Sequence, residues 1–217
     1  MTGKEDKQLF SSFSTATMNT LESHENELPF SLLFHILSLL FSQILSMHYT
    51  LAVTFTVDRL RALQNLIKKI DAEAQEWGIP DARIMDMRLT ADMFSFSRQV
   101  QIASDNAKGM AGRLSWKEVP SFADDETTLQ LLVERLEKTI DFLSSLSESD
   151  FAWAEEQEAR FPWFPGVHMK GGSYLLSYAI PNFMFHITTA YAILRHHGFE
   201  IGKSDFLGTL PLIPDTK

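Results

Sequence analysis

Hydrophobic residues recur every three or four positions along most of this chain, a spacing that is typical of amphipathic helices. The longest regular stripe begins at Tyr49 and ends at Trp77, where Gly78 and Pro80 form a typical helix C-terminus. Three further segments show the same periodicity, and the polar or acidic residues at their first turns suit helix N-termini. The predicted helices cover 49–77, 92–114, 124–146 and 173–197.

This pattern predicts an all-α protein, a four-helix bundle, because four striped helices with little strand signal bury their apolar faces best against one another. The connection between the third and fourth helices, 147–172, contains two prolines and a glycine among aromatic residues, so we expect a short hairpin or an ordered loop there. The fourth helix is apolar on nearly every side, which indicates a buried position. Pro181 removes one of its backbone hydrogen bonds and is expected to kink it.

The first 46 residues differ from the rest and are predicted to be an N-terminal extension of a bundle at 47–210, which a tail at 211–217 follows. Residues 1–27 are polar and are expected to be disordered, whereas 28–46 are expected to form an apolar helix with a narrow polar stripe. That helix has three interpretations: a membrane span, a signal peptide, or an amphipathic helix lying on a membrane or on the protein itself. Acidic residues before it disfavour the signal peptide. A further alternative is that Met47 is the natural start of the chain.

Composition and charge exclude several classes of function. The 217 residues include no cysteine, which excludes disulfide frameworks, thiolate nucleophiles and cysteine-containing zinc sites. The net charge is −9, and no cluster of Lys and Arg is long enough to form a nucleic-acid-binding surface. A chain without cysteine suits a reducing compartment, so we expect a cytoplasmic protein, or a membrane-associated one if the helix at 28–46 contacts a bilayer.

The candidate chemistry centres on two polar residues of the apolar fourth helix. Asn182 and His186 are four residues apart and therefore share one face. His186 has the residue type of a general base or a metal ligand, and its alternative role is that of a core histidine with a satisfied hydrogen bond. On the second helix, Asp105 lies one turn after Gln101 and is expected to face His186 as an acid–base partner, or else to be a solvated or capping acid.

Two other groups have a functional and a structural interpretation. Arg88 can bind a substrate carboxylate through two hydrogen bonds, or it can form a structural salt bridge with Asp92 at the start of the second helix. A set of aromatic residues near the long connection can line an apolar pocket for a planar ligand, or form a core over one end of the bundle. This set comprises Trp163, Phe164, Tyr174 and Tyr178.

Three separated motifs carry a resemblance to a known family. They are 88–94 (RLTADMF), 98–105 (RQVQIASD), and 181–198 followed by 202–208 (GKSDFLG). In this order they resemble the domain of unknown function 1993 family over roughly 47–208, a family that is similar to the DinB/YfiT-like bundles. The resemblance implies an up-down-down-up four-helix bundle and a homodimer. It also implies a divalent metal held by three histidines, one from the second helix and two spaced four apart on the fourth, and in some members a thiol-dependent transferase or isomerase activity.

This sequence departs from that metal-binding pattern. The fourth helix offers Asn182 and His186, and the second helix has no histidine, so Gln101 or Asp105 would have to replace one. One imidazole with amide oxygens is a poor zinc or nickel site, so we predict no metal and no other cofactor. The first hypothesis is therefore a protein that binds or transforms a small organic molecule by metal-independent proton transfer, as isomerases and dehydratases do, with His186 as the base. The alternative is a non-catalytic dimerisation or binding module, or a membrane-attached version of it, in which the polar pair specifies the register of the bundle.

Overall fold

The computed structural model describes residues 30–215, and the bundle lies within a compact unit that extends from Ile44 to the C-terminus. The predicted disorder of 1–27 and the first residues of the predicted helix 28–46 lie outside the described residues. A helix, α2 (Phe30–Tyr49), covers the rest of that predicted segment. None of the helices in the described part of the chain is both long and apolar enough to cross a membrane.

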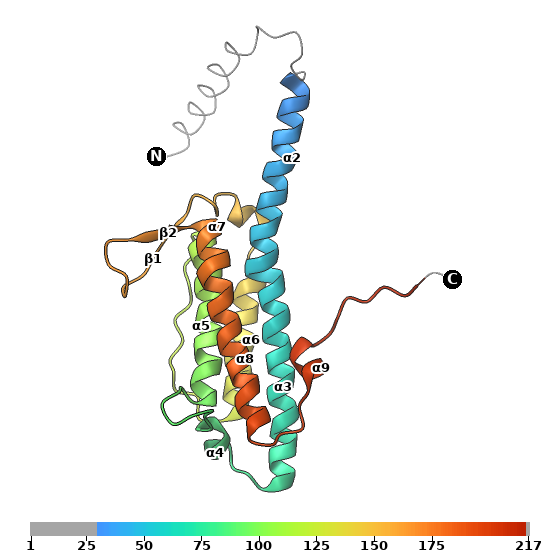
Figure 1. The fold of residues 1–217 in the computed structure, drawn as a ribbon, viewed down its shortest axis with the longest axis vertical. Helices are drawn as coiled ribbons and strands as arrows, with labels where there is room; N and C mark the ends of the chain where they lie inside the picture. Colours follow the sequence, from blue (N-terminus) through green and yellow to red (C-terminus); the bar gives the residue numbers. More distant parts are fainter. Residues whose placement is uncertain (1–29, 216–217) are drawn as a thin grey trace. The chain divides into compact units, whose positions relative to one another are not determined.

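Four long helices form the bundle: α3 (Thr56–Trp77), α5 (Phe96–Ser115), α6 (Leu129–Ser144) and α8 (Ile180–His196). Helix α5 packs against both α6 and α8, and α3 packs against α6. Figure 1 shows that α5 and α6 run in the same direction, because the extended connection 116–128 returns along the bundle before α6 begins. This is the up-down-down-up order that the family resemblance implies.

Shorter elements complete the fold. The helical turns are η1 (Thr50–Phe55), α4 (Asp81–Met85), η2 (Glu148–Phe151), α7 (Gly171–Tyr174), η3 (Leu175–Ala179) and α9 (Lys203–Leu207). The predicted hairpin is confirmed: β1 (Glu158–Arg160) pairs antiparallel with β2 (His168–Lys170), with Ala159 opposite Met169. The predicted end of the first long helix is also confirmed, since Gly78 caps α3 with a left-handed φ of +66°.

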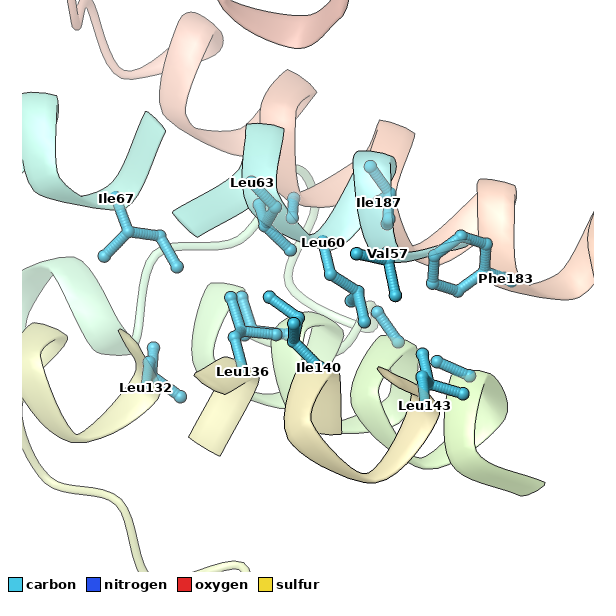
Figure 2. Packing of buried hydrophobic residues seen from close by; sticks show 14 of the residues in the cluster. Val57, Leu60, Leu63, Ile67, Leu132, Leu136, Ile140, Leu143, Phe183 and Ile187 are labelled. Carbon is cyan, nitrogen blue, oxygen red and sulfur yellow. The ribbon is translucent and has the colours of Figure 1, made fainter. Parts of the chain in front are cut away.

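The core between the helices consists of the residues that form the apolar stripes. Figure 2 shows side chains from α3, α6 and α8 meeting at the centre of the bundle. Leu60, Ile67, Leu136 and Phe183 are each fully buried there. Burying side chains of this size contributes roughly 1.5–3 kcal/mol each, which holds the helices in one register. The labelled set is Val57, Leu60, Leu63, Ile67, Leu132, Leu136, Ile140, Leu143, Phe183 and Ile187.

Two helix starts differ from the predicted ones because a later residue acts as the N-cap. Helix α5 begins at Phe96, not near Asp92, since the side chain of Ser95 accepts a hydrogen bond from the backbone N–H of Arg98 at 3.4 Å. Helix α6 begins after Thr128, whose hydroxyl accepts the backbone N–H of Leu131 at 3.2 Å. The acidic residues at 124–126 therefore belong to the connection and not to the first turn of a helix.

The last helix also starts differently from the prediction. It begins with α7 at Gly171, two residues before the predicted cap at Ser173. The π-helical turn η3 follows, and then α8, with Pro181 in its first turn. Proline has no N–H to donate, so we expect the helical hydrogen-bond pattern to change directly before Pro181, as it does in the π-helical turn η3.

Candidate functional site

The site is built on a hydrogen bond between the two helices α5 and α8. Nδ1 of His186 lies 2.6 Å from Oε1 of Gln99, and these two side chains retain only 8% and 1% exposure. Gln99 stands on α5 two residues before Gln101. Successive helical residues are about 100° apart around the axis, so Gln99 and Gln101 point to nearly opposite sides. Gln99 faces α8, and Gln101 does not.

The orientation of Gln99 determines which nitrogen of His186 carries the proton. The amide Nε2 of Gln99 donates to the backbone carbonyl of Phe94 at 3.4 Å, which leaves its Oε1 as the acceptor that faces the imidazole. Nδ1 of His186 therefore carries the hydrogen and donates it. In the neutral ring the other nitrogen, Nε2, then has a free lone pair and is the basic atom of the site.

The surroundings of His186 keep its ring neutral. Burial lowers the pKa of His186 below its usual value of 6.5, and the positive charge of nearby Arg98 lowers it further. The ring edge of His186 also meets Phe185, with 5.3 Å between the ring centroids. A neutral imidazole at neutral pH can accept a proton, so its protonation state suits a general base.

This lowered pKa predicts how pH changes stability. The unfolded chain protonates His186 below pH 6.5, whereas the folded chain does so only at a lower pH, so folding becomes less favourable as the pH falls through that window. We expect the wild type to lose stability relative to His186→Gln between about pH 7.5 and about pH 5.5, with the difference measured by urea unfolding. A difference that does not change with pH, or that grows in the opposite direction, would contradict the lowered pKa.

Asp105 is not the partner of His186, which corrects the contact predicted from the sequence. Asp105 forms ion pairs with Arg135 of α6 at 2.8 Å and with Lys108 at 2.9 Å. Asp105 lies one turn after Gln101 on the side of α5 that faces α6 and the connection 116–128, so it points away from α8. Gln101 shares that side: its Nε2 donates to Glu126 at 2.8 Å, and its Oε1 accepts from Arg98 at 3.2 Å.

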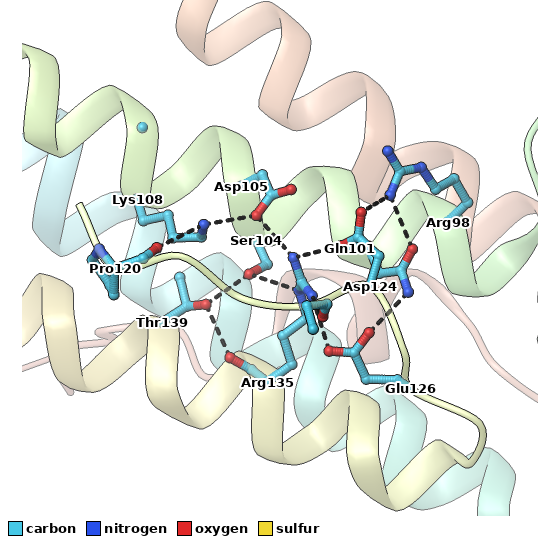
Figure 3. A network of polar contacts seen from close by, with 12 residues as sticks. Arg98, Gln101, Ser104, Asp105, Lys108, Pro120, Asp124, Glu126, Arg135 and Thr139 are labelled. Atoms are coloured by element: carbon cyan, nitrogen blue, oxygen red, sulfur yellow. Dashed lines mark hydrogen bonds and ion pairs between the residues drawn. The ribbon is translucent and has the colours of Figure 1, made fainter.

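Gln101 and Asp105 instead belong to a polar network that surrounds Arg135 (Figure 3). Arg135 is 2% exposed and forms ion pairs with Glu126 at 2.9 Å and with Asp124 at 3.1 Å, besides Asp105. It also donates to the carbonyl of Ala123 at 2.9 Å. Its pKa is raised despite burial, because these carboxylates favour its charged form. The network fastens the connection 116–128 onto α5 and α6, so we assign it a structural role.

Arg88 and Asp92 do not form the predicted salt bridge with each other. Arg88 pairs with Asp86 at 2.9 Å and donates to the carbonyl of Met93 at 2.7 Å. Asp92 is exposed and accepts a hydrogen bond from the hydroxyl of Thr90. Both residues shape the turn before α5. Arg88 has a partner in the fold already, so a carboxylate ligand would have to compete with Asp86.

The predicted aromatic group is present, but a further residue organises it. The ring of Phe161 lies 4.9 Å from Tyr178 and 5.7 Å from Tyr174, measured between centroids. Trp163 and Phe164 also contact Phe161, at 5.3 and 6.3 Å, and are more than half exposed. The group packs the hairpin onto the start of the last helix, which agrees with the interpretation of a core over one end of the bundle.

Two further amide side chains, those of Asn182 and Asn106, lie on α8 and α5. Asn182 is half-buried, and within residues 30–215 its side chain has no hydrogen bond. Asn106 lies seven residues after Gln99 and hence on the same face of α5. Its amide nitrogen is fully buried and has no hydrogen-bond partner among the described residues. Such a donor is costly unless something outside these residues satisfies it.

The sequence indicates that Gln99 and Arg135, which were not among the predicted site residues, are buried. Gln99 lies three residues after Phe96 and four before Ala103, both fully buried, so the apolar stripe itself places Gln99 inside the bundle. Arg135 likewise stands between Leu132 and Leu136 on the stripe of α6. In both helices a polar residue within the apolar stripe was the signal.

The residues present do not fit the three-histidine metal site that the DinB-like resemblance implies. On α8 one imidazole, His186, is accompanied by the amide of Asn182, and the α5 side chain that reaches it is Gln99. The described residues hold no group of three or more His, Asp or Glu side chains arranged around a metal ion. An amide oxygen that already accepts a hydrogen bond from Nδ1 is a weak ligand for zinc or nickel, so this set of side chains does not suit a tightly bound transition metal.

Comparisons with known proteins agree with this architecture. The family model described as a domain of unknown function, DUF1993, matches residues 48–207. A crystal structure described as a DinB family member protein from Shewanella denitrificans is 38% identical and superposes with a TM-score of 0.77, covering 80% of this chain and 99% of that chain. The search of curated proteins gives no match. The bundle is thus DinB-like, and the chain belongs to the DUF1993 family.

Proposed function

We propose that this protein binds a small organic molecule between α5 and α8 and transforms it by metal-independent proton transfer, with Nε2 of His186 as the base. The class of reaction is an isomerisation or dehydration, in which a base removes a proton from carbon and an acid returns one. The single observation that carries the proposal is the 2.6 Å contact between Nδ1 of His186 and Oε1 of Gln99. That contact orients the ring and reserves Nε2 for the ligand, as a catalytic imidazole requires.

The amides on the same two helices support a ligand that carries an oxygen acceptor. Among the described residues, the buried amide N–H of Asn106 has no hydrogen-bond partner, and the amide of Asn182, four residues before His186, has none either. A carbonyl or carboxylate oxygen of the ligand would accept from such donors, which removes the cost of burying them. Asp105 is not assigned the second catalytic role, since its carboxylate is committed to Arg135 and Lys108.

The test begins with the full-length protein. Mass spectrometry of the purified wild type under non-denaturing conditions identifies a co-purifying small molecule, which then serves as the substrate for turnover assays. We expect His186→Gln to reduce turnover by about 10²–10⁴-fold, the usual contribution of a general base. His196→Gln is the matched control, since His196 is an exposed histidine near the end of the same helix. A His186→Gln variant with wild-type turnover would exclude the proposal.

A second candidate is a non-catalytic binding or dimerisation module, favoured by the burial of the same polar pair. If the pair only specifies how α5 and α8 align, replacing both residues with leucine removes two buried polar groups together. The carbonyl of Phe94 loses the donor Nε2 of Gln99, but Phe94 is an exposed residue. The doubly substituted protein, Gln99→Leu with His186→Leu, is then expected to stay folded, with equal or higher stability and unchanged binding. Loss of ligand binding or turnover in that protein would favour the first proposal.

The homodimer and a membrane contact through residues 28–46 stay predictions. Light scattering coupled to size-exclusion chromatography measures the oligomeric state. The membrane contact is tested by separating membrane and soluble fractions of cells that contain the full chain or a chain that starts at Met47. The same distribution of both proteins between the two fractions would exclude the contact.

A further inference from the structure

A cavity lies away from His186, where α5 ends beside the hairpin. Its volume is about 760 Å³, within the range of small-molecule sites. The last residues of α5 and the chain directly after it form one wall, and residues 156–158 with Arg160 form the other. Nothing in the proposed proton transfer at His186 uses these residues.

Trp116 lines this cavity in a conformation that its residue type disfavours. Among the non-glycine residues of 30–215, Trp116 alone has a positive φ, at +58°, and its side chain is 80% exposed. The turn is tight because the chain reverses over Gly112, where an added Cβ would overlap the side chain of Val119 and lie 3.3 Å from the carbonyl oxygen of Lys117. Glycine or asparagine is the ordinary residue at such a helix end. Tryptophan at this position strains the backbone and leaves its ring exposed, so the stability of the fold does not explain why a tryptophan stands there.

Arg113 supplies a positioned cation in the same cavity. Its guanidinium lies over the ring of Phe161 at 5.4 Å and near that of Tyr174 at 6.0 Å, and it donates to the carbonyl of Gly109 at 2.9 Å. No carboxylate of the described residues forms an ion pair with it. A guanidinium held on aromatic faces keeps further N–H donors for a carboxylate.

The remaining charges of the cavity divide into paired and available groups. Lys117 is paired with Asp150 at 2.8 Å, and Arg160 with Glu158 at 2.6 Å. Glu118 and Glu156 are exposed and, within the described part of the chain, their carboxylates have no ion pair. The cavity thus presents one cation, two carboxylates and one exposed aromatic face to a ligand.

We propose that this cavity binds a small zwitterion with a flat apolar group, namely a free amino acid with an aromatic side chain. The carboxylate of the ligand pairs with Arg113, its ammonium group with Glu118 or Glu156, and its ring stacks on Trp116. Among the described residues Arg113, Glu118 and Glu156 have no ion pair, so each charged group of the ligand meets an opposite charge that is available, and offset stacking of two rings is favourable. A purely anionic ligand would meet the two carboxylates, and a purely cationic one would meet Arg113.

Isothermal titration calorimetry of the full chain with L-phenylalanine tests the proposal. We expect saturable binding, weakened at least about tenfold for 3-phenylpropanoate, which lacks the ammonium group, and for 2-phenylethylamine, which lacks the carboxylate. Absence of saturable binding of L-phenylalanine overturns the proposal. Equal binding of either analogue also overturns it, since one of the two charged contacts would then be missing.

Trp116→Gly separates binding from folding. Glycine adopts the left-handed conformation without strain, so the melting temperature is expected to rise by a few degrees, about 2–4 °C, while L-phenylalanine binding weakens at least about tenfold. His186→Gln is the control and should bind L-phenylalanine as the wild type does. Unchanged binding by Trp116→Gly would overturn the role of the tryptophan and with it the proposal, whatever the result at His186.

Discussion

Replacing Arg135 with methionine is expected to lower the free energy of unfolding by about 3–5 kcal/mol, the usual cost of removing one partner from a buried ion pair. Methionine retains an unbranched apolar chain as far as the position of Nε, but not the five N–H donors of the guanidinium. Glu126, Asp124 and Asp105 would each lose an ion pair, and the carbonyl of Ala123 would lose its donor. Urea unfolding of the purified variant measures the change.

Lys138→Met is the matched control for this substitution. Lys138 lies three residues after Arg135 on the same helix and is exposed, so its replacement is expected to change stability by less than about 0.5 kcal/mol. Adding Glu126→Gln to Arg135→Met should recover part of the loss, since it removes a carboxylate that has lost its cation. If Arg135→Met costs no more than the control, the network does not hold the connection 116–128 in place.

Gly171→Ala is expected to cost about 1–3 kcal/mol or more, because the added methyl group has no space. A Cβ at this position would overlap the carbonyl oxygen of Ala154 and lie 2.7 Å from its carbonyl carbon. The backbone N–H of Gly171 also donates to the carbonyl of Glu155 at 3.2 Å. The segment that contains the fully buried Phe151 would have to move away from the start of α7. Thermal unfolding followed by circular dichroism measures the loss.

The neighbouring glycine provides the control for Gly171. The nearest atoms to a Cβ on Gly172 would be those of the Glu155 carboxylate, with Oε1 at 2.8 Å. That side chain is exposed and can rotate at the cost of its 3.2 Å contact with Nε2 of His48, so the expected loss is smaller than at Gly171. Alanine also has the higher helix propensity, which offsets part of the contact. Equal losses for Gly171→Ala and Gly172→Ala would show that backbone crowding at Ala154 is not the cause.

The architecture could be predicted because the apolar stripes of the helices coincide with the core. Leu60 and Ile67 on α3 face Leu132 and Leu136 on α6, as their periodicity requires. The helix starts were less predictable, since several residues compete to cap each helix. Ser95 caps α5 in place of Asp92, because the carboxylate of Asp92 accepts a hydrogen bond from the hydroxyl of Thr90 in the turn before the helix.

The candidate site could be predicted on one helix and not on the other. His186 was visible because it interrupts a helix that is otherwise apolar. Its partner was not, since Gln99, Gln101 and Asp105 all lie within two turns of α5, and only the packing of that helix decides which of them faces α8. Residues two positions apart in a helix point to nearly opposite sides, so Gln99 contacts His186 whereas Gln101 contacts Glu126.

The role of His186 as the base depends on its protonation state, which the ¹⁵N and ¹H resonances of the imidazole report during a pH titration. If His186 is the base of the site, we expect a neutral ring at pH 7 with the hydrogen on Nδ1, a lone pair on Nε2, and a pKa below 6.5 that returns toward 6.5 in the unfolded chain. A ring protonated on Nε2 alone, or a pKa at or above 6.5 in the folded protein, would contradict it.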